Sequence, residues 1–260
     1  MSREEVTLMK IFYSKTKEEA GKKAAGSFAA VLKNKPDAVL GLATGSSPEP
    51  MYLSLAEMYN AGEVSFAKAR SVNLDEYVGL SADHDQSYAY FMRKHLFDKV
   101  DIDLANTNLP NGLATNYAAE CARYDALFDS FGGTDLQILG IGLNGHIGFN
   151  EPADEFTKGT NAVKLTESTI KANSRFFASE IDVPTMALSM GIGQIMRAKK
   201  IILLANGKAK ADILEAALFG KVTPTVPASI LQFAADVEVY ADEDALSVII
   251  EKHGKDAVIY

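Results

Sequence analysis

AVLGLATGSSPEPMYLSLAEMYN, residues 38–60, joins a short apolar run, a small polar loop and a segment of helical period. The apolar run 38–43 predicts a buried strand. Pro48 marks the start of the helix, because proline is well tolerated in the first turn of a helix. A strand that passes directly into a helix is the repeating unit of parallel sheets that helices cover on both faces. This stretch therefore predicts an α/β protein.

Apolar runs and helical segments alternate in the same way along the rest of the 260 residues. The predicted strands span Met9–Tyr13, Ala38–Ala43, Ser71–Leu74, Leu136–Ile141, Met186–Met190, Ile201–Ala205 and Val237–Ala241. The predicted helices span Thr16–Lys33, Pro48–Asn60, Ser87–Val100, Asn116–Phe131, Lys208–Leu218 and Glu243–Lys252. Neither a Pro/Gly/Ser-rich linker nor a change of composition divides the chain. We therefore predict a single domain, residues 1–260, with a doubly wound, mainly parallel, Rossmann-like sheet and helices on both faces.

The composition argues against several classes of partner. Asp and Glu total 34 against 26 Lys and Arg, a net charge of -8 without a basic block, so we expect no nucleic-acid partner. No apolar run approaches the roughly 18 residues that span a bilayer, and the N-terminus lacks the layout of a signal peptide. We therefore expect no membrane partner and a cytoplasmic location. The single cysteine, Cys121, excludes an internal disulfide and favours a packed side chain.

The polar loop within the opening stretch has the properties of a phosphate site. Its glycine allows close backbone approach, its hydroxyls donate hydrogen bonds, and the following helix presents free N–H groups and the positive end of its dipole. The alternative is an ordinary helix cap, which one serine would supply. The candidate ligands in this loop are Thr44, Gly45, Ser46 and Ser47.

Asp75 follows directly after the predicted strand 71–74, in the sequence NLDEYVG. Ligands of open parallel sheets bind beyond the carboxyl ends of the strands. This carboxylate therefore stands where a general base would be placed. The alternative is a residue that only completes a turn.

GIGLNGHIGFNEP, residues 140–152, combines four glycines with several polar side chains. Its first three glycines fit the dinucleotide pattern G-x-G-x-x-G, but that pattern needs a helix to begin at the third glycine. Gly148 and Pro152 break such a helix, so we predict a tight polar loop and no NAD site. Within the loop, His146 stands among glycines, and the carboxylate of Glu151 follows five positions later. This arrangement favours a catalytic imidazole.

Basic side chains that could complete a phosphate site occur in two places. Arg175 lies in ANSRFF, and both Lys208 and Lys210 follow the predicted strand 201–205. The alternative for each of them is a solvated surface charge. None of the other three histidines has the spacing of a metal site, so we expect no metal.

Six segments together resemble the glucosamine-6-phosphate deaminase family, also called glucosamine-6-phosphate isomerase: LGLATGSSPEPMY, VNLDEYVGL, SYAYFMRKHLF, LGIGLNGHIGFNEP, ANSRFF and GKAKA. The resemblance implies a doubly wound α/β fold with the active site at the strand ends. It also implies the conversion of an amino-sugar phosphate, glucosamine 6-phosphate, to fructose 6-phosphate and ammonia. Neither a metal nor an organic cofactor is implied.

The resemblance also assigns roles to single residues. Asp75 resembles the base that moves a proton from carbon 2 to carbon 1 of the opened sugar. His146 resembles the group that opens the pyranose ring, with Glu151 orienting it. Many members of the family carry Asp where this chain has Asn144, which can act only by hydrogen bonding. The residues that fall where the family holds the sugar phosphate are Ser46, Ser47, Arg175 and Lys210.

Several alternatives stay open at this point. A 6-phosphogluconolactonase-like hydrolase and a non-catalytic sugar-phosphate sensor share the fold. Neither the oligomeric state nor the preference between glucosamine and galactosamine 6-phosphate follows from the sequence. The resemblance also implies that allosteric members of the family bind the phosphate of N-acetylglucosamine 6-phosphate with a basic pair in the stretch that corresponds to 160–166. Asn161 and Val163 stand there instead, so we expect no activation by that effector.

Overall fold

The computed structural model describes residues 9–174, 177, 179 and 182–260. Its central sheet has seven parallel strands. In spatial order they are β1 (Met9–Ser14), β10 (Val237–Asp242), β9 (Ile201–Ala205), β6 (Leu136–Gly140), β2 (Val39–Leu42), β3 (Arg70–Asn73) and β5 (Thr107–Asn108). All residues of β2, β9 and β10 are buried, as expected for strands covered on both faces.

The strand order reverses at the centre of this sheet. From β2 the chain continues outward to β3 and β5, and from β6 it continues in the other direction to β9 and β10. Strands β2 and β6 lie side by side, with Leu40 opposite Leu136. The loops that follow these two strands therefore diverge from one point, which is where open α/β sheets bind ligands. The predicted doubly wound, mainly parallel fold is confirmed.

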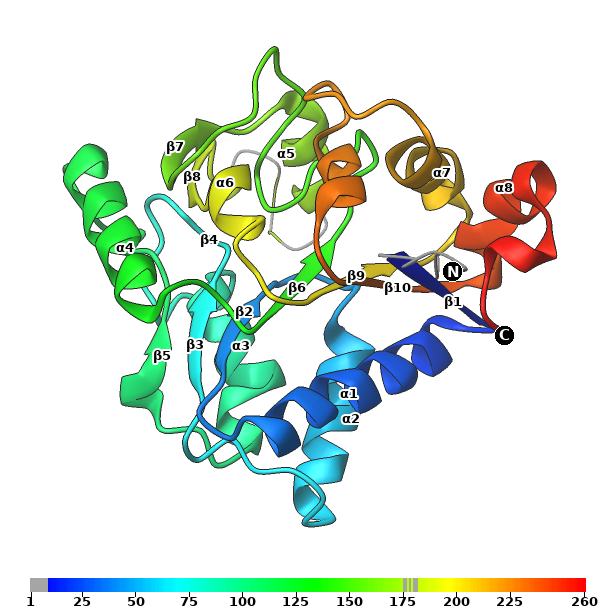
Figure 1. Cartoon of the computed structure of the whole chain (residues 1–260). Coiled ribbons are helices and arrows are strands. Elements are labelled where there is room, and N and C mark those ends of the chain that lie inside the picture. Colours follow the sequence, from blue (N-terminus) through cyan, green and yellow to red (C-terminus); the bar gives the residue numbers. More distant parts are fainter. Residues whose placement is uncertain (1–8, 175–176, 178, 180–181) are drawn as a thin grey trace, which may run out of the picture.

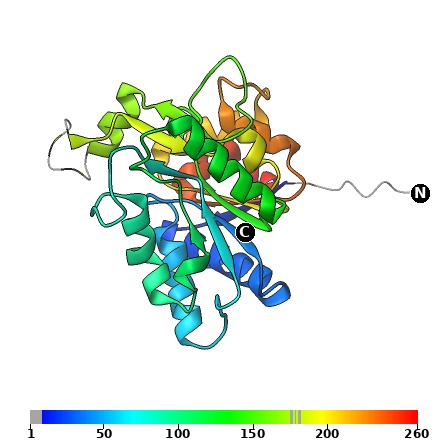
Figure 2. The ribbon, with the colours of Figure 1, turned by 90° about the vertical axis from the view of Figure 1, so that its left-hand side faces the viewer.

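Helices cover both faces of the sheet. They are α1 (Lys17–Asn34), α2 (Glu49–Asn60), α3 (Tyr88–His95), α4 (Tyr117–Phe131), α5 (Glu167–Asn173), α6 (Ile192–Ile195), α7 (Ala211–Phe219) and α8 (Glu243–His253). Figure 1 shows α1 and α2 together below the sheet and α7 and α8 above it. Figure 2 shows α1 and α2, in blue, on the opposite side of the sheet from the yellow and orange C-terminal segments.

Local sequence explains where the helices begin and end. The Thr16 side chain accepts a hydrogen bond from the Glu19 N–H and so caps the start of α1. Helix α4 ends at Gly132, whose φ of 75° is readily adopted only by glycine. The predicted helix 87–100 is shorter than expected, because the backbone leaves the helical region at Leu96 and continues as a 3₁₀ turn, Phe97–Lys99.

A second, antiparallel sheet corrects one sequence prediction. The strand predicted at Met186–Met190 forms as β8 (Met186–Ser189), but it lies outside the parallel sheet, between β4 (Asp75–Tyr77) and β7 (Asn161–Lys164). The chain leaves the main sheet after β3, and the Met190 N–H donates to the Leu74 carbonyl at 2.7 Å. This bond places β8 against the turning strand. The small sheet therefore lies beyond the carboxyl end of β3, and Asp75 is its first residue.

Candidate active site

The loop after β2 contains hydrogen-bond donors without a protein partner among the described residues. Gly45 has a φ of +93°, which turns the backbone sharply between the strand and α2. The backbone N–H groups of Gly45, Ser46 and Ser47 donate to no other group in the described part of the chain. The same holds for the hydroxyls of the two serines. The residue that caps α2 is Pro48, without a side-chain hydrogen bond, so these serines are not helix caps. These accessible donors at the N-terminus of α2 are of the kind that could bind an anion.

Asp75 lies at the base of the site, where it is 6% exposed. Its carboxylate accepts no hydrogen bond from any residue that the structure describes. Burial, and after it the negative charge of Glu76, raises the pKa of Asp75 to about 8. A carboxylate in these surroundings is a much stronger base than one in water once it is ionised.

Glu76, next to Asp75, is a buried carboxylate that the sequence analysis did not single out. It is 3% exposed and accepts hydrogen bonds from the backbone N–H groups of Tyr77, Tyr88 and Ala89 at 2.8 to 2.9 Å. The last two are the first residues of α3. A buried carboxylate therefore joins the strand that carries Asp75 to the helix that forms one wall of the site.

The loop after β6 contains a chain of three polar side chains. The Asn144 Nδ2 donates to Glu151 Oε2 at 2.6 Å, and the Asn144 Oδ1 lies 2.8 Å from His146 Nδ1. Because a carboxylate only accepts, the amide nitrogen must face Glu151 and its oxygen must face the ring. The Nδ1 of His146 therefore carries a proton, so in the neutral ring the lone pair is on Nε2. Among the described residues, Nε2 has no hydrogen-bond partner.

Close packing in this loop depends on a glycine. A Cβ atom on Gly142 would collide with the imidazole ring of His146. The Gly142 N–H also donates to the His146 carbonyl at 2.9 Å, which closes the loop into a tight turn. No helix begins at Gly145, in agreement with the polar loop predicted from the sequence.

Glu151 is held in its ionised form. Burial by itself would raise its pKa, but His146, whose Nδ1 lies 3.5 Å away, and hydrogen bonds from Thr169 and Asn144 lower the pKa of Glu151 to about 2. The Thr169 hydroxyl donates to Oε1 at 2.6 Å. Thr169 lies on α5, in a segment with no recognisable sequence motif, so sequence reasoning missed it. A fixed negative charge thus lies behind the Asn144–His146 pair.

The structure distinguishes the two lysines after β9. Lys208 Nζ donates to the hydroxyl of Ser247 on α8 at 2.7 Å, outside the site. Lys210 lines the cleft that also contains the polar loop after β2. Arg175, the other predicted phosphate ligand, lies outside the described residues.

One cleft of about 870 Å³ brings the candidate residues together. Its lining includes Thr44, Gly45, Ser46, Ser47, Asp75, Asn144, His146 and Lys210, while Glu151 lies immediately behind Asn144. Helix α3 supplies further lining residues that were not predicted, among them Tyr88, Phe91 and His95. The ring of His95 stacks on Phe91, with their centroids 4.2 Å apart.

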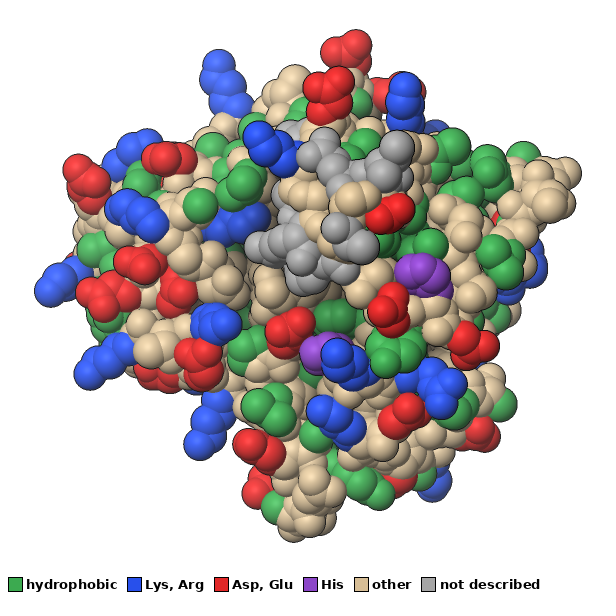
Figure 3. Space-filling model, turned by 180° about the vertical axis from the view of Figure 1, so that it is seen from behind, with side chains coloured by type: hydrophobic (Ala, Val, Ile, Leu, Met, Phe, Trp, Pro, Cys, Tyr) green, Lys and Arg blue, Asp and Glu red, His purple; other side chains and the backbone are tan. Residues whose placement is uncertain are grey.

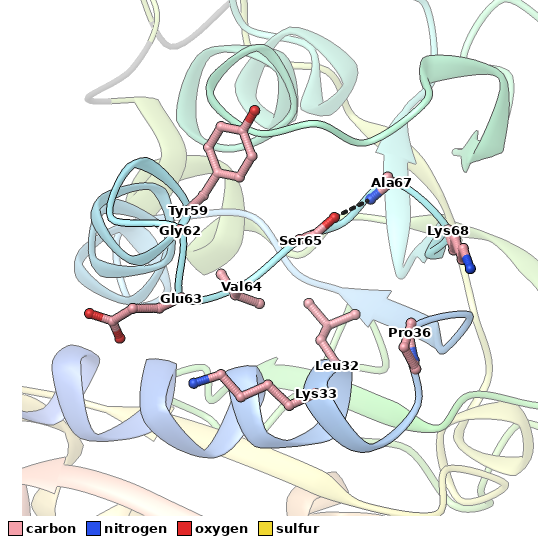
Figure 4. A pocket seen from close by; sticks show the side chains of 10 residues that line it. All are labelled: Leu32, Lys33, Pro36, Tyr59, Gly62, Glu63, Val64, Ser65, Ala67 and Lys68. Atoms are coloured by element: carbon pink, nitrogen blue, oxygen red, sulfur yellow. Dashed lines mark hydrogen bonds between the residues drawn. The ribbon is translucent and has the colours of Figure 1, made fainter.

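A second cavity, of about 470 Å³, lies before the amino ends of β2 and β3 (Figure 4). Its lining comprises Leu32, Lys33, Pro36, Tyr59, Gly62, Glu63, Val64, Ser65, Ala67 and Lys68. Its charged members, Lys33, Glu63 and Lys68, are all exposed to solvent. None of the residues predicted from the sequence as ligands or catalytic groups lines this cavity.

The surface carries charges of both signs. On the face shown in Figure 3, Lys and Arg side chains are interspersed with Asp and Glu side chains. Proteins that bind nucleic acid usually present a continuous basic surface instead. None of the helices in the described part of the chain combines the length and the apolar character needed to cross a membrane.

Comparison with known families gives a direct match. The model of the family described as glucosamine-6-phosphate isomerases/6-phosphogluconolactonase matches residues 14–240. The chain belongs to this family. Its members of known name include a glucosamine-6-phosphate deaminase from Clostridium perfringens, 53% identical over 241 residues, which cover 93% of this chain and 100% of the relative. A second, from Lachnoclostridium phytofermentans, bears the same name and is 54% identical over 231 residues, 89% of this chain and 98% of the relative.

Solved structures agree with this family membership. A monomeric glucosamine-6-phosphate deaminase superposes with a TM-score of 0.90 at 45% identity, and the match covers 92% of this chain and 100% of that chain. A 6-phosphogluconolactonase from Trypanosoma brucei superposes with a TM-score of 0.71 at 17% identity, covering 92% and 97%. At 17% identity the second likeness shows the shared fold alone.

Proposed function

We propose that the chain is a glucosamine-6-phosphate deaminase, which converts glucosamine 6-phosphate and water to fructose 6-phosphate and ammonia. The observation that carries the proposal is the composition of the cleft. The loop after β2, with its unpartnered donors, lines the same cleft as a desolvated carboxylate, Asp75, and an imidazole whose Nε2 has no partner among the described residues, His146. High identity to relatives that bear this name supports the same conclusion.

The loop after β2 would hold the phosphate of the substrate. The backbone N–H groups of residues 44–47 and the hydroxyls of Thr44, Ser46 and Ser47 supply donors, and Lys210, which lines the same cleft, supplies a positive charge. By resemblance to the family, Arg175 is a further ligand. Anchoring the phosphate fixes the sugar relative to Asp75 and His146, so each proton transfer becomes effectively intramolecular.

His146 would open the pyranose ring. Its Nε2 lone pair accepts the proton of the anomeric hydroxyl and returns a proton to the ring oxygen as the bond between carbon 1 and that oxygen breaks. The imidazolium formed between these two transfers is stabilised by Asn144, whose Oδ1 accepts from Nδ1–H, and by the carboxylate of Glu151 behind it. Asn144 and Glu151 therefore serve to orient and stabilise the imidazole, and neither needs to take up its proton.

Asp75 would then carry out the isomerisation. Ionised, it removes the proton from carbon 2 of the open aldehyde and delivers a proton to carbon 1, which leaves an imine at carbon 2. Water adds to this imine, and ammonia leaves, giving the ketone of fructose 6-phosphate. The net reaction hydrolyses a carbon–nitrogen bond, which makes the enzyme a hydrolase. The raised pKa of Asp75 suits it to abstract a proton from carbon, which is a weak acid.

Release of ammonia tests this function. The purified chain is incubated with glucosamine 6-phosphate, and ammonia is followed with a coupled dehydrogenase. We expect ammonia and fructose 6-phosphate in equal amounts. A 6-phosphogluconolactonase would release no ammonia and would instead hydrolyse 6-phosphogluconolactone, and a sensor domain would bind the sugar phosphate without turnover of either compound.

A further inference from the structure

Ser189 joins the two halves of the active site. It is the last residue of β8, fully buried, and lies directly opposite Asp75 in the antiparallel sheet. Its Oγ accepts the backbone N–H of Phe149 at 3.0 Å. Phe149 belongs to the same glycine-rich loop as His146. One hydroxyl therefore connects the strand beside Asp75 to the loop that carries the imidazole.

Gly148 allows the loop to approach this closely. It has a φ of +58°, and a Cβ atom at this position would lie 3.2 Å from Ser189 Oγ and 3.6 Å from Asp75 Oδ2. The loop backbone thus rests directly on the pair formed by Ser189 and Asp75. The neighbouring Asn150 adds to this contact by donating from Nδ2 to the Met190 carbonyl at 2.8 Å.

We propose that Ser189 is a positioning residue, which sets the spacing between His146 and Asp75 by accepting the Phe149 N–H. This role rests on the proposed function. The ring oxygen and carbon 2 of a hexosamine are both bonded to carbon 1. The imidazole of His146 and the carboxylate of Asp75, which act on these two atoms, must therefore lie at a fixed distance from each other. The hydrogen bond from the Phe149 N–H to Ser189 fixes the distance between the glycine-rich loop, residues 140–152, and the carboxylate of Asp75. Neither the phosphate loop nor Lys210 takes part in this contact.

The test compares three variants with the wild type. Ser189→Ala removes the acceptor of the Phe149 N–H, and Ser189→Thr keeps a hydroxyl in the same place. Ser27→Ala is the matched control, because it removes the hydrogen bond that the Ser27 hydroxyl, on α1, donates to Glu238 on β10, away from the site. We expect Ser189→Ala to lower kcat about 10- to 100-fold, the scale of a misplacement of about 1 Å, with KM changed less than about threefold. Ser189→Thr and Ser27→Ala should stay within about threefold of the wild type.

A second substrate separates positioning from general loss of structure. An analogue without the hydroxyls at carbons 4 and 5 cannot close a ring and needs only Asp75 for exchange of its carbon 2 proton. We expect Ser189→Ala to retain most of this exchange while it loses turnover of glucosamine 6-phosphate. Equal losses with both compounds, or full activity of Ser189→Ala, would overturn the role of Ser189 alone. A wild type that releases no ammonia would overturn the proposed function and this role with it.

Discussion

A cavity lies at each end of the parallel sheet, and the two cavities differ in the burial and the hydrogen-bond partners of their polar side chains. At the carboxyl end, the cleft contains the buried Asp75, an imidazole held on one side only, and a loop whose donors have no partner among the described residues. At the amino end, the cavity in Figure 4 has an apolar floor, and its charged side chains are exposed. Solvated charges need no protein partner, whereas a buried carboxylate that accepts no hydrogen bond, such as Asp75, costs stability.

In this fold the surroundings of the polar side chains distinguish a candidate active site better than the size of a cavity does. Size alone does not distinguish the two cavities decisively, since both could hold a small molecule. At the carboxyl end, burial and the charge of Glu76 raise the pKa of Asp75, and His146 with two hydrogen bonds lowers the pKa of Glu151 despite its burial. The following experiments test whether catalysis belongs to this end of the sheet alone.

The largest effect is expected at Asp75. Asp75→Asn keeps the shape of the side chain but cannot accept the proton from carbon 2, so kcat for ammonia release should fall by about 10² to 10⁴. Binding of the sugar phosphate should be largely retained, because the donors of the phosphate loop are unchanged. Lys68→Ala in the other cavity is the control and should change kcat less than about twofold. Comparable losses in both variants would remove the distinction between the two ends.

A smaller and more selective effect is expected at His146. His146→Gln should lower turnover of glucosamine 6-phosphate about 10²-fold, because ring opening loses its acid and base. Proton exchange at carbon 2 of the analogue that cannot form a ring should change less than about threefold. Both rates are measured on the same preparation of the variant. Equal losses on the two compounds would show that His146 does more than open the ring.

Glu76 should affect the pH profile more than the maximal rate. Asp75 works as a base only when ionised, and its pKa of about 8 means that kcat/KM falls as the pH drops through that region. Glu76→Gln removes a like charge, so Asp75 should stay ionised to lower pH. The acid limb, the pH range in which kcat/KM falls, should therefore move to lower pH. The substrate amine is the same in both assays, so its contribution to the pH dependence of kcat/KM cancels when the two enzymes are compared. An unchanged limb would show that Glu76 only caps α3.

No effect is expected from N-acetylglucosamine 6-phosphate. Strand β7 alternates half-buried and exposed side chains, so Asn161 and Val163 lie on one face and Lys164 on the other. Neither Asn161 nor Val163 offers a positive charge for a phosphate, and an effector without differential binding shifts no equilibrium. Initial rates should depend hyperbolically on substrate and stay unchanged when the compound is added. A sigmoidal curve that it makes hyperbolic would contradict this expectation.

Sequence patterns predicted the main sheet well because buried parallel strands are short, apolar and punctuated by loops. The same reasoning placed Met186–Met190 in the wrong sheet, since an apolar run reports burial and not the partner strand. Asp75, His146 and Lys210 could be predicted as candidates because they follow strand ends or stand among glycines, and all three line one cleft. Glu76, Thr169 and Ser189 were missed because their importance comes from contacts between segments far apart in sequence.

The most direct test of the account compares two substrates on the wild-type chain. Initial rates with glucosamine 6-phosphate and with 6-phosphogluconolactone are measured on one preparation, by ammonia release and by acid release respectively. The account predicts steady release of ammonia, matched one for one by fructose 6-phosphate, and lactone hydrolysis no faster than the uncatalysed reaction. Hydrolysis of the lactone without release of ammonia would contradict it.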